Sequence, residues 1–304
     1  MLSILSKKAK VVVHSGKFHP DDICAVAIVS LYLGKSVKII RSRDPKDWAE
    51  ADYVFDVGGV YDPEKNRFDH HQTEFTLKRE NGICYSSAGL AWKHFGEKIA
   101  GSGEIWKKID EKIIQPIDAE DNGQELYKNN FENIAPYTFA DYLHAFNLTY
   151  FEKKEKSIKA FATAVNEAKK MFKREVKRAK DNLRTYKIVE DIYRRTSDKR
   201  LIILDDEYSW QNVIGNHPEP LFVVKPSLES GTWHAYAVRS TKGDKFKSRL
   251  DFPESWGGLR DEELAKTTGV SDAIFCHKGR FIAVARSKEG AIALAKLALE
   301  ADKH

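Results

Sequence analysis

Histidines and aspartates that could bind a metal gather in the first third of the sequence. The stretch VVVHSGKFHPDDICA (residues 11–25) holds two histidines and two aspartates, and the later stretch FDHHQ adds an Asp-His-His run. Imidazole and carboxylate ligands without thiolate suit Mn, Fe, Co or Zn better than Ca or Mg. The residue types therefore predict a site for a divalent metal ion.

Alternating strand and helix patterns surround these residues. The segments KVVVH, SVKIIRSR and ADYVFDVGG predict buried strands, and DDICAVAIVSLYLG predicts a helix that ends at Gly34. SSAGLAWKHFG and IWKKIDEKIIQPIDAEDNG continue the pattern as helices. A strand, a helix and a second strand joined by short connections form a right-handed parallel unit, so we expect an open α/β sheet in the first half.

The topology of such a sheet would bring the polar groups together. Ligands of open parallel sheets bind in the crevice at the carboxyl ends of the strands. A lone His or Asp at a strand end is usually a turn or cap residue, but several at successive strand ends of one sheet favour a metal site. Asp118 and Asp121 lie three residues apart, on one face of a helix. The groups at the strand ends are His14, His19, Asp21, Asp22, Asp56, Asp69, His70 and His71.

Composition sets the broad class. The 304 residues, 42% of them hydrophobic, are enough for two cores, and a net charge of +5 is too small to diagnose nucleic-acid binding. The three cysteines are far apart and odd in number, which favours neither a disulfide framework nor a zinc finger. The N-terminal MLSILSKKAK resembles no leader, and no apolar run could span a membrane. We expect a cytoplasmic protein without a membrane partner.

The second half of the chain has a different texture. Residues 151–197 are rich in helix formers and basic residues, which predicts either a long solvated helix or a basic face for a polyanion. Strand-like segments and a closing helix then follow. We therefore expect three parts: a metal-dependent domain over 1–150, a basic helical connector over 151–197, and a smaller α/β substrate domain over 198–304.

The ordered motifs HSGKFHPDD, FDVGG, FDHHQ and DAEDNG resemble those of the DHH phosphoesterase superfamily. The similarity is closer to one branch, the melanocyte-proliferating-gene family of 3′ to 5′ RNA exonucleases. It extends to RSRDP, VGGVYDPEKNRFDHHQ, SSAGLAWKHFG, SRLDFPESWGGLRDEEL and FCHKGRFIAVARSKEGA, and so covers nearly the whole chain. The resemblance implies a DHH-type parallel-sheet domain followed by a substrate domain.

The resemblance also implies residue roles. Asp56 matches the carboxylate that bridges two metals, and a histidine at position 19 is typical of the exonuclease branch. Asp118 and Asp121 both fit the fourth acidic motif, so both stay candidates. Asp22, Asp69 and His71 are expected to orient ligands or touch the phosphate and, with Asp56, to serve catalysis. The implied metal ligands are His14, His19, Asp21, Asp56, His70, Asp118 and Asp121.

The implied cofactor is a pair of divalent cations, with Mn²⁺ favoured and Mg²⁺, Co²⁺ or Zn²⁺ as alternatives. Two cations about 3.5–4 Å apart lower the pKa of a bridging water, align phosphorus for in-line attack and neutralise the leaving oxygen. This chemistry needs no side-chain nucleophile. The sequence contains neither a GxxxxGK phosphate loop nor a GxSxG elbow, which argues against NTPases and serine hydrolases.

Substrate recognition is expected in the second domain. The paired glycines of SRLDFPESWGGLR could expose backbone amides to a phosphate, although an ordinary turn explains them as well. Trp256, Phe275 and Phe281 could stack on bases, but core packing is the more common role of aromatics in strands. The candidate substrate-binding residues are Arg239, Arg249, Gly257, Gly258, Arg260, His277 and Arg280.

The favoured function is a metal-dependent phosphodiesterase that degrades single-stranded RNA or short oligonucleotides from an end to nucleoside monophosphates. One alternative keeps the metal site but acts on pyrophosphate, polyphosphate or a cyclic dinucleotide. Another is a non-catalytic RNA-binding protein with a structural metal. Acidic clusters usually mark catalysis, which favours an enzyme. The sequence leaves the oligomeric state open, a homodimer included.

Overall fold

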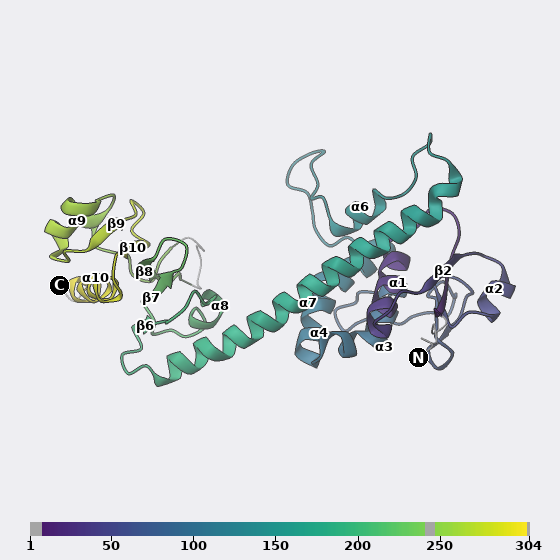
Figure 1. The fold of residues 1–304 in the computed structure, drawn as a ribbon, viewed down its shortest axis with the longest axis horizontal. Coiled ribbons are helices and arrows are strands. Elements are labelled where there is room, and N and C mark those ends of the chain that lie inside the picture. Colours follow the sequence, from purple (N-terminus) through teal and green to yellow (C-terminus); the bar gives the residue numbers. More distant parts are fainter. Residues whose placement is uncertain (1–7, 241–246, 303–304) are drawn as a thin grey trace, which may run out of the picture. The chain divides into compact units, whose positions relative to one another are not determined.

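The computed structural model describes residues 8–240 and 247–302, so most of the N-terminal stretch considered above lies outside the described residues. The chain divides into two compact units, Met1–Lys180 and Asp181–His304. The division falls within one long helix, α7 (Ser157–Arg195) (Figure 1). The domain boundaries expected at residues 150 and 197, which would assign all of α7 to a connector, stay a prediction.

The sheet of unit 1 has the strand order β2-β1-β3-β5-β4. Strands β2, β1, β3 and β5 run parallel, and only the edge strand β4 is antiparallel to its neighbour. The buried run Val11, Val12 and Val13 forms the centre, as expected for a parallel strand covered on both faces. The bounds are β1 Lys10–Val13, β2 Lys38–Arg41, β3 Tyr53–Phe55, β4 Tyr61–Asp62 and β5 Arg67–Phe68.

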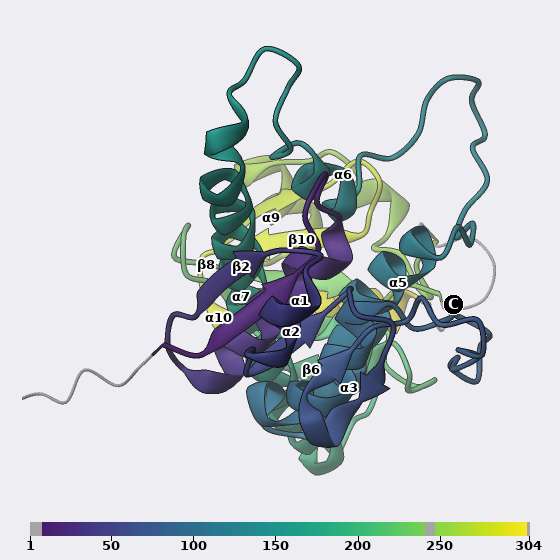
Figure 2. The ribbon, with the colours of Figure 1, turned by 90° about the vertical axis from the view of Figure 1, so that its right-hand side faces the viewer.

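Helices complete unit 1 (Figure 2). Helix α1 is buried along most of its length and ends at Gly34 in a left-handed conformation, as the sequence predicts. It packs against α3. A short π-helix, Asp110–Ile114, joins α4 to α5. The bounds are α1 Pro20–Leu33, α2 Pro45–Ala49, α3 Ser87–Ala100, α4 Gly103–Ile109, α5 Gln115–Asp121 and α6 Phe139–His144.

Helix α7 contributes to both cores. Phe161, Ala168 and Phe172 are buried in unit 1, at the spacing of one helix face, and Val189 and Tyr193 are buried in unit 2. Most of its basic side chains lie on the exposed side. The described residues therefore show the amphipathic helix that the basic segment predicts, with an apolar stripe under the charges.

Unit 2 is an α/β unit whose sheet has the strand order β6-β7-β8-β10-β9. Strands β6 and β7 are parallel and the other pairs are antiparallel. Helix α10 packs on this sheet through Ala291, Leu294 and Ala298. The α/β class expected for both halves is confirmed. The bounds are β6 Leu201–Ile203, α8 Gln211–Ile214, β7 Phe222–Ser227, β8 Thr232–Ala237, α9 Asp261–Thr268, β9 Ala273–Cys276, β10 Ile282–Ala285 and α10 Lys288–Ala301.

Candidate metal centre

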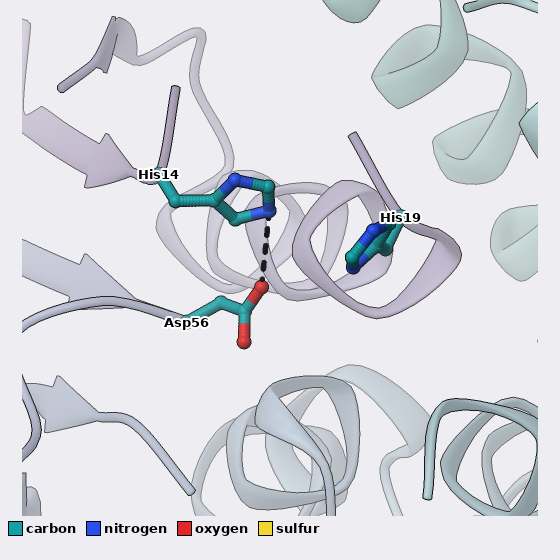
Figure 3. Close-up of side chains that lie close together, drawn as sticks. All are labelled: His14, His19 and Asp56. Carbon is teal, nitrogen blue, oxygen red and sulfur yellow. Dashed lines mark ion pairs between the residues drawn. The ribbon is translucent and has the colours of Figure 1, made fainter. Parts of the chain in front are cut away.

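His14 follows β1 directly and points toward Asp56 at the end of β3 (Figure 3). Its Nδ1 lies 3.0 Å from the Ser15 carbonyl oxygen, and this contact turns Nε2 toward the carboxylates. Nε2 lies 3.1 Å from Asp22 Oδ2 and 3.2 Å from Asp56 Oδ2. Burial alone would lower the pKa of His14, but the two carboxylates raise it to about 10.

Asp56 faces imidazoles on two sides. Its Oδ2 meets His14, whereas its Oδ1 lies 3.3 Å from His70 Nε2 and 3.6 Å from His71 Nδ1. Burial would raise the pKa of Asp56, but His14 and His70 hold it well below its ordinary value. The residue also has a φ of 56°, a left-handed conformation that costs a non-glycine residue energy and is concentrated at functional sites.

A further group of candidate ligands forms where α1 begins and α5 ends. Ligand atoms of His19, Asp21 and Asp121 lie within 4.8 Å of one another. Asp21 is fully buried, and burial together with Asp56 and Asp121 raises its pKa well above the ordinary value. His70 Nε2 lies 3.3 Å from Asp121 Oδ2, so His70 connects this group to Asp56.

The donor set fits a divalent metal. Both carboxylate oxygens of Asp21 are buried without a hydrogen-bond partner, and so are the Nε2 atoms of His14 and His70. Leaving such atoms unpaired is costly, and a cation would satisfy them all. The ligand atoms are imidazole nitrogens and carboxylate oxygens, without a thiolate. The chain therefore carries a site for a divalent metal.

The two candidate aspartates of α5 differ sharply. Asp118 is fully buried and accepts hydrogen bonds from Ser86, from the Gly89 amide at 2.9 Å and from Arg79 at 2.7 Å. A Cβ at Gly89 would collide with the Asp118 carboxylate, which explains a glycine inside α3. Asp121 points instead to His19, Asp21 and His70. Of the two, Asp121 therefore has the geometry of a ligand.

The remaining predicted groups of the motifs support the ligands. Asp69 is buried and accepts the Gly59 amide at 2.6 Å and His71 Nδ1 at 2.7 Å. Its bond to His71 raises the pKa of that imidazole. Asp22 accepts the His19 amide at 3.1 Å and so fixes the start of α1. These contacts leave the side chain of His71 largely exposed, at 63%.

Two residues near the site were not singled out from the sequence. Arg43 lines a cavity of ≈ 400 Å³ with His14, His19, Asp56 and His71. Its only signal was its place in the RSRDP motif. His144 has no motif around it, but its ring centroid lies 6.1 Å from that of His19. It lines a smaller cavity of ≈ 200 Å³ with Asp121.

The structure places the predicted substrate-binding residues in unit 2. Arg249 donates to the carbonyl oxygens of Gly215, His217 and Pro220. The guanidinium of Arg260 lies 4.4 Å from the centre of the Phe275 ring.

The other members of this set also have neighbours in the unit. The amides of Gly257 and Gly258 donate to Glu254 and Cys276. His277 Nδ1 accepts the Gly279 amide at 2.8 Å, and Arg280 lies 3.7 Å from Asp251. Arg239 pairs with Ser248 through a β-bridge. The roles of all seven residues in substrate binding stay a prediction.

The sequence relationships identify the family. A family model named MYG1_exonuc, described as the uncharacterised protein family UPF0160, matches residues 10–299. The chain belongs to this family. A MYG1 protein of Chlamydia muridarum is 31% identical over 284 residues, which cover 91% of each chain. A human protein named MYG1 exonuclease is 28% identical, over 94% of this chain and 84% of its own length. The resemblance to the melanocyte-proliferating-gene family is confirmed.

Family membership and the site together define the enzyme class. The chain is a hydrolase, a metal-dependent phosphoesterase. A solved pGpG-specific phosphodiesterase, PggH from Vibrio cholerae, aligns over 97% of this chain, but a TM-score of 0.33 and 13% identity carry no argument. Among the described residues, no helix is long and apolar enough to cross a membrane.

Proposed function

We propose that the chain is a 3′ to 5′ exonuclease that hydrolyses single-stranded RNA or short oligonucleotides to nucleoside monophosphates in the cytoplasm. The position of Asp56 carries the proposal. Its two carboxylate oxygens face different imidazoles, His14 on one side and His70 on the other. A carboxylate shared in this way suits two cations, and two-metal sites are typical of nucleases. Relatives named exonuclease support a nucleic-acid substrate.

The six ligands in this proposal come from separate segments of unit 1. The strand ends supply His14 and Asp56, the turn and start of α1 supply His19 and Asp21, and the other two are His70 and Asp121. Mn²⁺ is the proposed metal, and Mg²⁺, Co²⁺ and Zn²⁺ also accept such ligands. When bound, two such cations lower the pKa of a water and neutralise charge on the phosphate.

The other residues of the site position the substrate. Asp69 accepts the proton of His71 Nδ1 and raises the pKa of this imidazole, and in the protonated imidazole Nε2 carries a second proton that can be donated to a phosphate oxygen. Arg43 lines the same cavity, and its guanidinium can donate to the phosphate at two points. Asp22 keeps the start of α1, and with it His19, in place.

Hydrolysis of end-labelled oligonucleotides tests the proposal. Purified protein is incubated with 5′- and 3′-labelled RNA and DNA and with pyrophosphate, each with Mn²⁺, Mg²⁺ or Zn²⁺. We expect monophosphates to be released from the 3′ end of RNA, and the pyrophosphate arm distinguishes a small-substrate phosphohydrolase.

Three variants complete this experiment. Asp56→Ala and His70→Ala should lose the activity. His94→Ala should keep it, because this histidine contacts Tyr61 rather than the metal centre. Equal degradation of RNA by the wild type and the Asp56 variant would rule the proposal out.

A further inference from the structure

Two fully exposed aromatic side chains lie on the segment between α6 and α7. Tyr150 and Phe151 are 95% and 93% exposed, and their ring centroids are 5.2 Å apart. Exposing two adjacent large rings to water is unfavourable. Figure 2 shows this segment leaving the body of unit 1 beside α6. Such a pair is typical of a surface that another molecule covers.

Both ends of this segment are tied to the loop that carries the first metal motif. At one end, the Asn147 side chain accepts the Phe18 amide at 3.0 Å and donates to the Phe18 carbonyl at 2.8 Å. At the other end, Arg41 donates to Ser157 and to the Gly16 carbonyl, both at 2.8 Å. Residues 148–156 therefore start and finish beside the loop that ends in His19.

This anchoring limits the distance between the aromatic pair and the metal centre. Three extended residues span at most about 10 Å, so Tyr150 lies within that reach of Asn147. Asn147 in turn bonds to Phe18, the residue before the candidate ligand His19. A strand of nucleic acid that enters the centre could thus meet the pair within a few nucleotides.

The charge around the pair is mainly positive. Glu155 and Glu152 are the acidic residues of the segment, and Glu152 is held by the Thr149 amide. The exposed lysines on the segment, on the start of α7 and on the motif loop are Lys17, Lys153, Lys154, Lys156 and Lys159. Exposed aromatics among lysines are the arrangement by which proteins bind single strands, since every base has a face that can stack.

We propose that Tyr150 and Phe151 stack on bases of a single-stranded nucleic acid whose end lies in the metal centre, and that the neighbouring lysines contact its phosphates. The proposal rests on the exonuclease function proposed above and adds a binding site for the substrate beyond the cleaved bond. It explains a preference for single strands, because paired bases are already stacked.

Steady-state kinetics of the double variant Y150A/F151A test this. The substrates are a short single-stranded RNA and bis(p-nitrophenyl) phosphate, which lacks the neighbouring nucleotides that the pair is proposed to bind. We expect the KM for RNA to rise about ten- to hundredfold while kcat and hydrolysis of the small diester are unchanged. Y150W/F151W should keep the KM of the wild type, because tryptophan also stacks on bases. Y137A should leave the KM unchanged, because Tyr137, which is 72% exposed, lies on another segment.

A phosphorothioate RNA measures affinity without cleavage, by fluorescence anisotropy. It tests the stacking site even if the wild type leaves RNA intact, a result that would refute the exonuclease function alone. Equal affinity and KM in the wild type and Y150A/F151A would refute the stacking site alone. A lower molar mass of Y150A/F151A in light scattering would assign the pair to contacts between copies of the chain, and would also overturn the proposal.

Discussion

Polar side chains have different hydrogen-bonding environments in the metal centre of unit 1 and among the predicted substrate residues of unit 2. In the metal centre, Asp21 and His70 are placed away from water with atoms that lack a hydrogen-bond partner. In unit 2, the Arg249 guanidinium donates hydrogen bonds to three backbone carbonyl oxygens. The first arrangement costs free energy in the absence of a ligand, and the second stabilises the unit without one.

This contrast separates sites from architecture. A buried polar group with its partners in the chain contributes to folding, as Asp118 does through Ser86, Gly89 and Arg79. A buried polar group without partners in the chain needs a bound ligand, such as a metal ion, to satisfy it. Residue type cannot distinguish the two, because aspartate and arginine serve in both. Substitutions of matched residues from the two classes should therefore have different effects on activity and on stability.

The two aspartates of α5 should give the largest difference. Asp121→Asn should lower hydrolysis about a hundredfold or more, because it removes a ligand charge, while the free energy of unfolding changes little. Asp118→Asn should instead lower the free energy of unfolding by about 3 kcal/mol, because it leaves buried Arg79 without one of its carboxylates. Urea denaturation and the rate per folded molecule measure both quantities. The contrast fails if Asp118→Asn abolishes activity in a protein of unchanged stability.

Substitution of Arg249 tests whether the polar residues of unit 2 stabilise the fold. Arg249→Met keeps much of the apolar stem but loses the bonds to Gly215, His217 and Pro220, so unfolding should become easier by about 2 kcal/mol. Arg260→Met, which loses a contact with the Phe275 ring, should cost about 0.5 kcal/mol. Chemical denaturation gives both values. A raised KM for RNA in a fully stable Arg249 variant would show that this arginine serves the substrate instead.

Much of the fold could be predicted from the sequence because local patterns determine it. The run KVVVH and the helix that ends at Gly34 appear where strand and helix periods predict them. The strand ends then bring together His14, Asp56 and His70, which are far apart in the sequence. The ends of parallel strands lie at one edge of a sheet, so the sheet topology alone predicts that these residues lie close together.

The rest depended on contacts between distant segments. Asp118 and Asp121 are equivalent in the sequence, and only the packing of α3 against α5 distinguishes them. His144 comes near His19 because Asn147 bonds to Phe18. No local sequence pattern predicts this contact between distant segments. Gly257 and Gly258 read equally well as a phosphate loop or a turn, and their amides donate within unit 2.

Metal binding should stabilise the protein and reveal which unpaired groups serve as ligands. Protein treated with a chelator should gain about 2.7 kcal/mol when Mn²⁺ is added at a hundred times its Kd. Asp121→Asn should lose most of this gain, whereas Arg249→Met should keep it, because Arg249 lies in unit 2. Thermal unfolding with and without Mn²⁺ measures the gain. An equal gain in all three proteins would place the metal elsewhere.

The smallest effect is expected at Asp21 in the metal-free protein, and its sign is the informative part. Asp21 is fully buried near Asp56 and Asp121 and has no hydrogen-bond partner, so its charge opposes folding until a cation is bound. Asp21→Asn removes the repulsion but buries an amide that also lacks partners, so the net gain in stability should be only about 1 kcal/mol.

The matched control is Asp181→Asn, a change of an exposed aspartate, which should move the free energy of unfolding by less than about 0.5 kcal/mol. Adding Mn²⁺ should reverse the order of Asp21→Asn and the wild type, because only the wild type keeps the full ligand set. Denaturation of both proteins with chelator and with Mn²⁺ measures this reversal. A variant that is less stable than the wild type under both conditions would show that the Asp21 carboxylate supports the fold by itself.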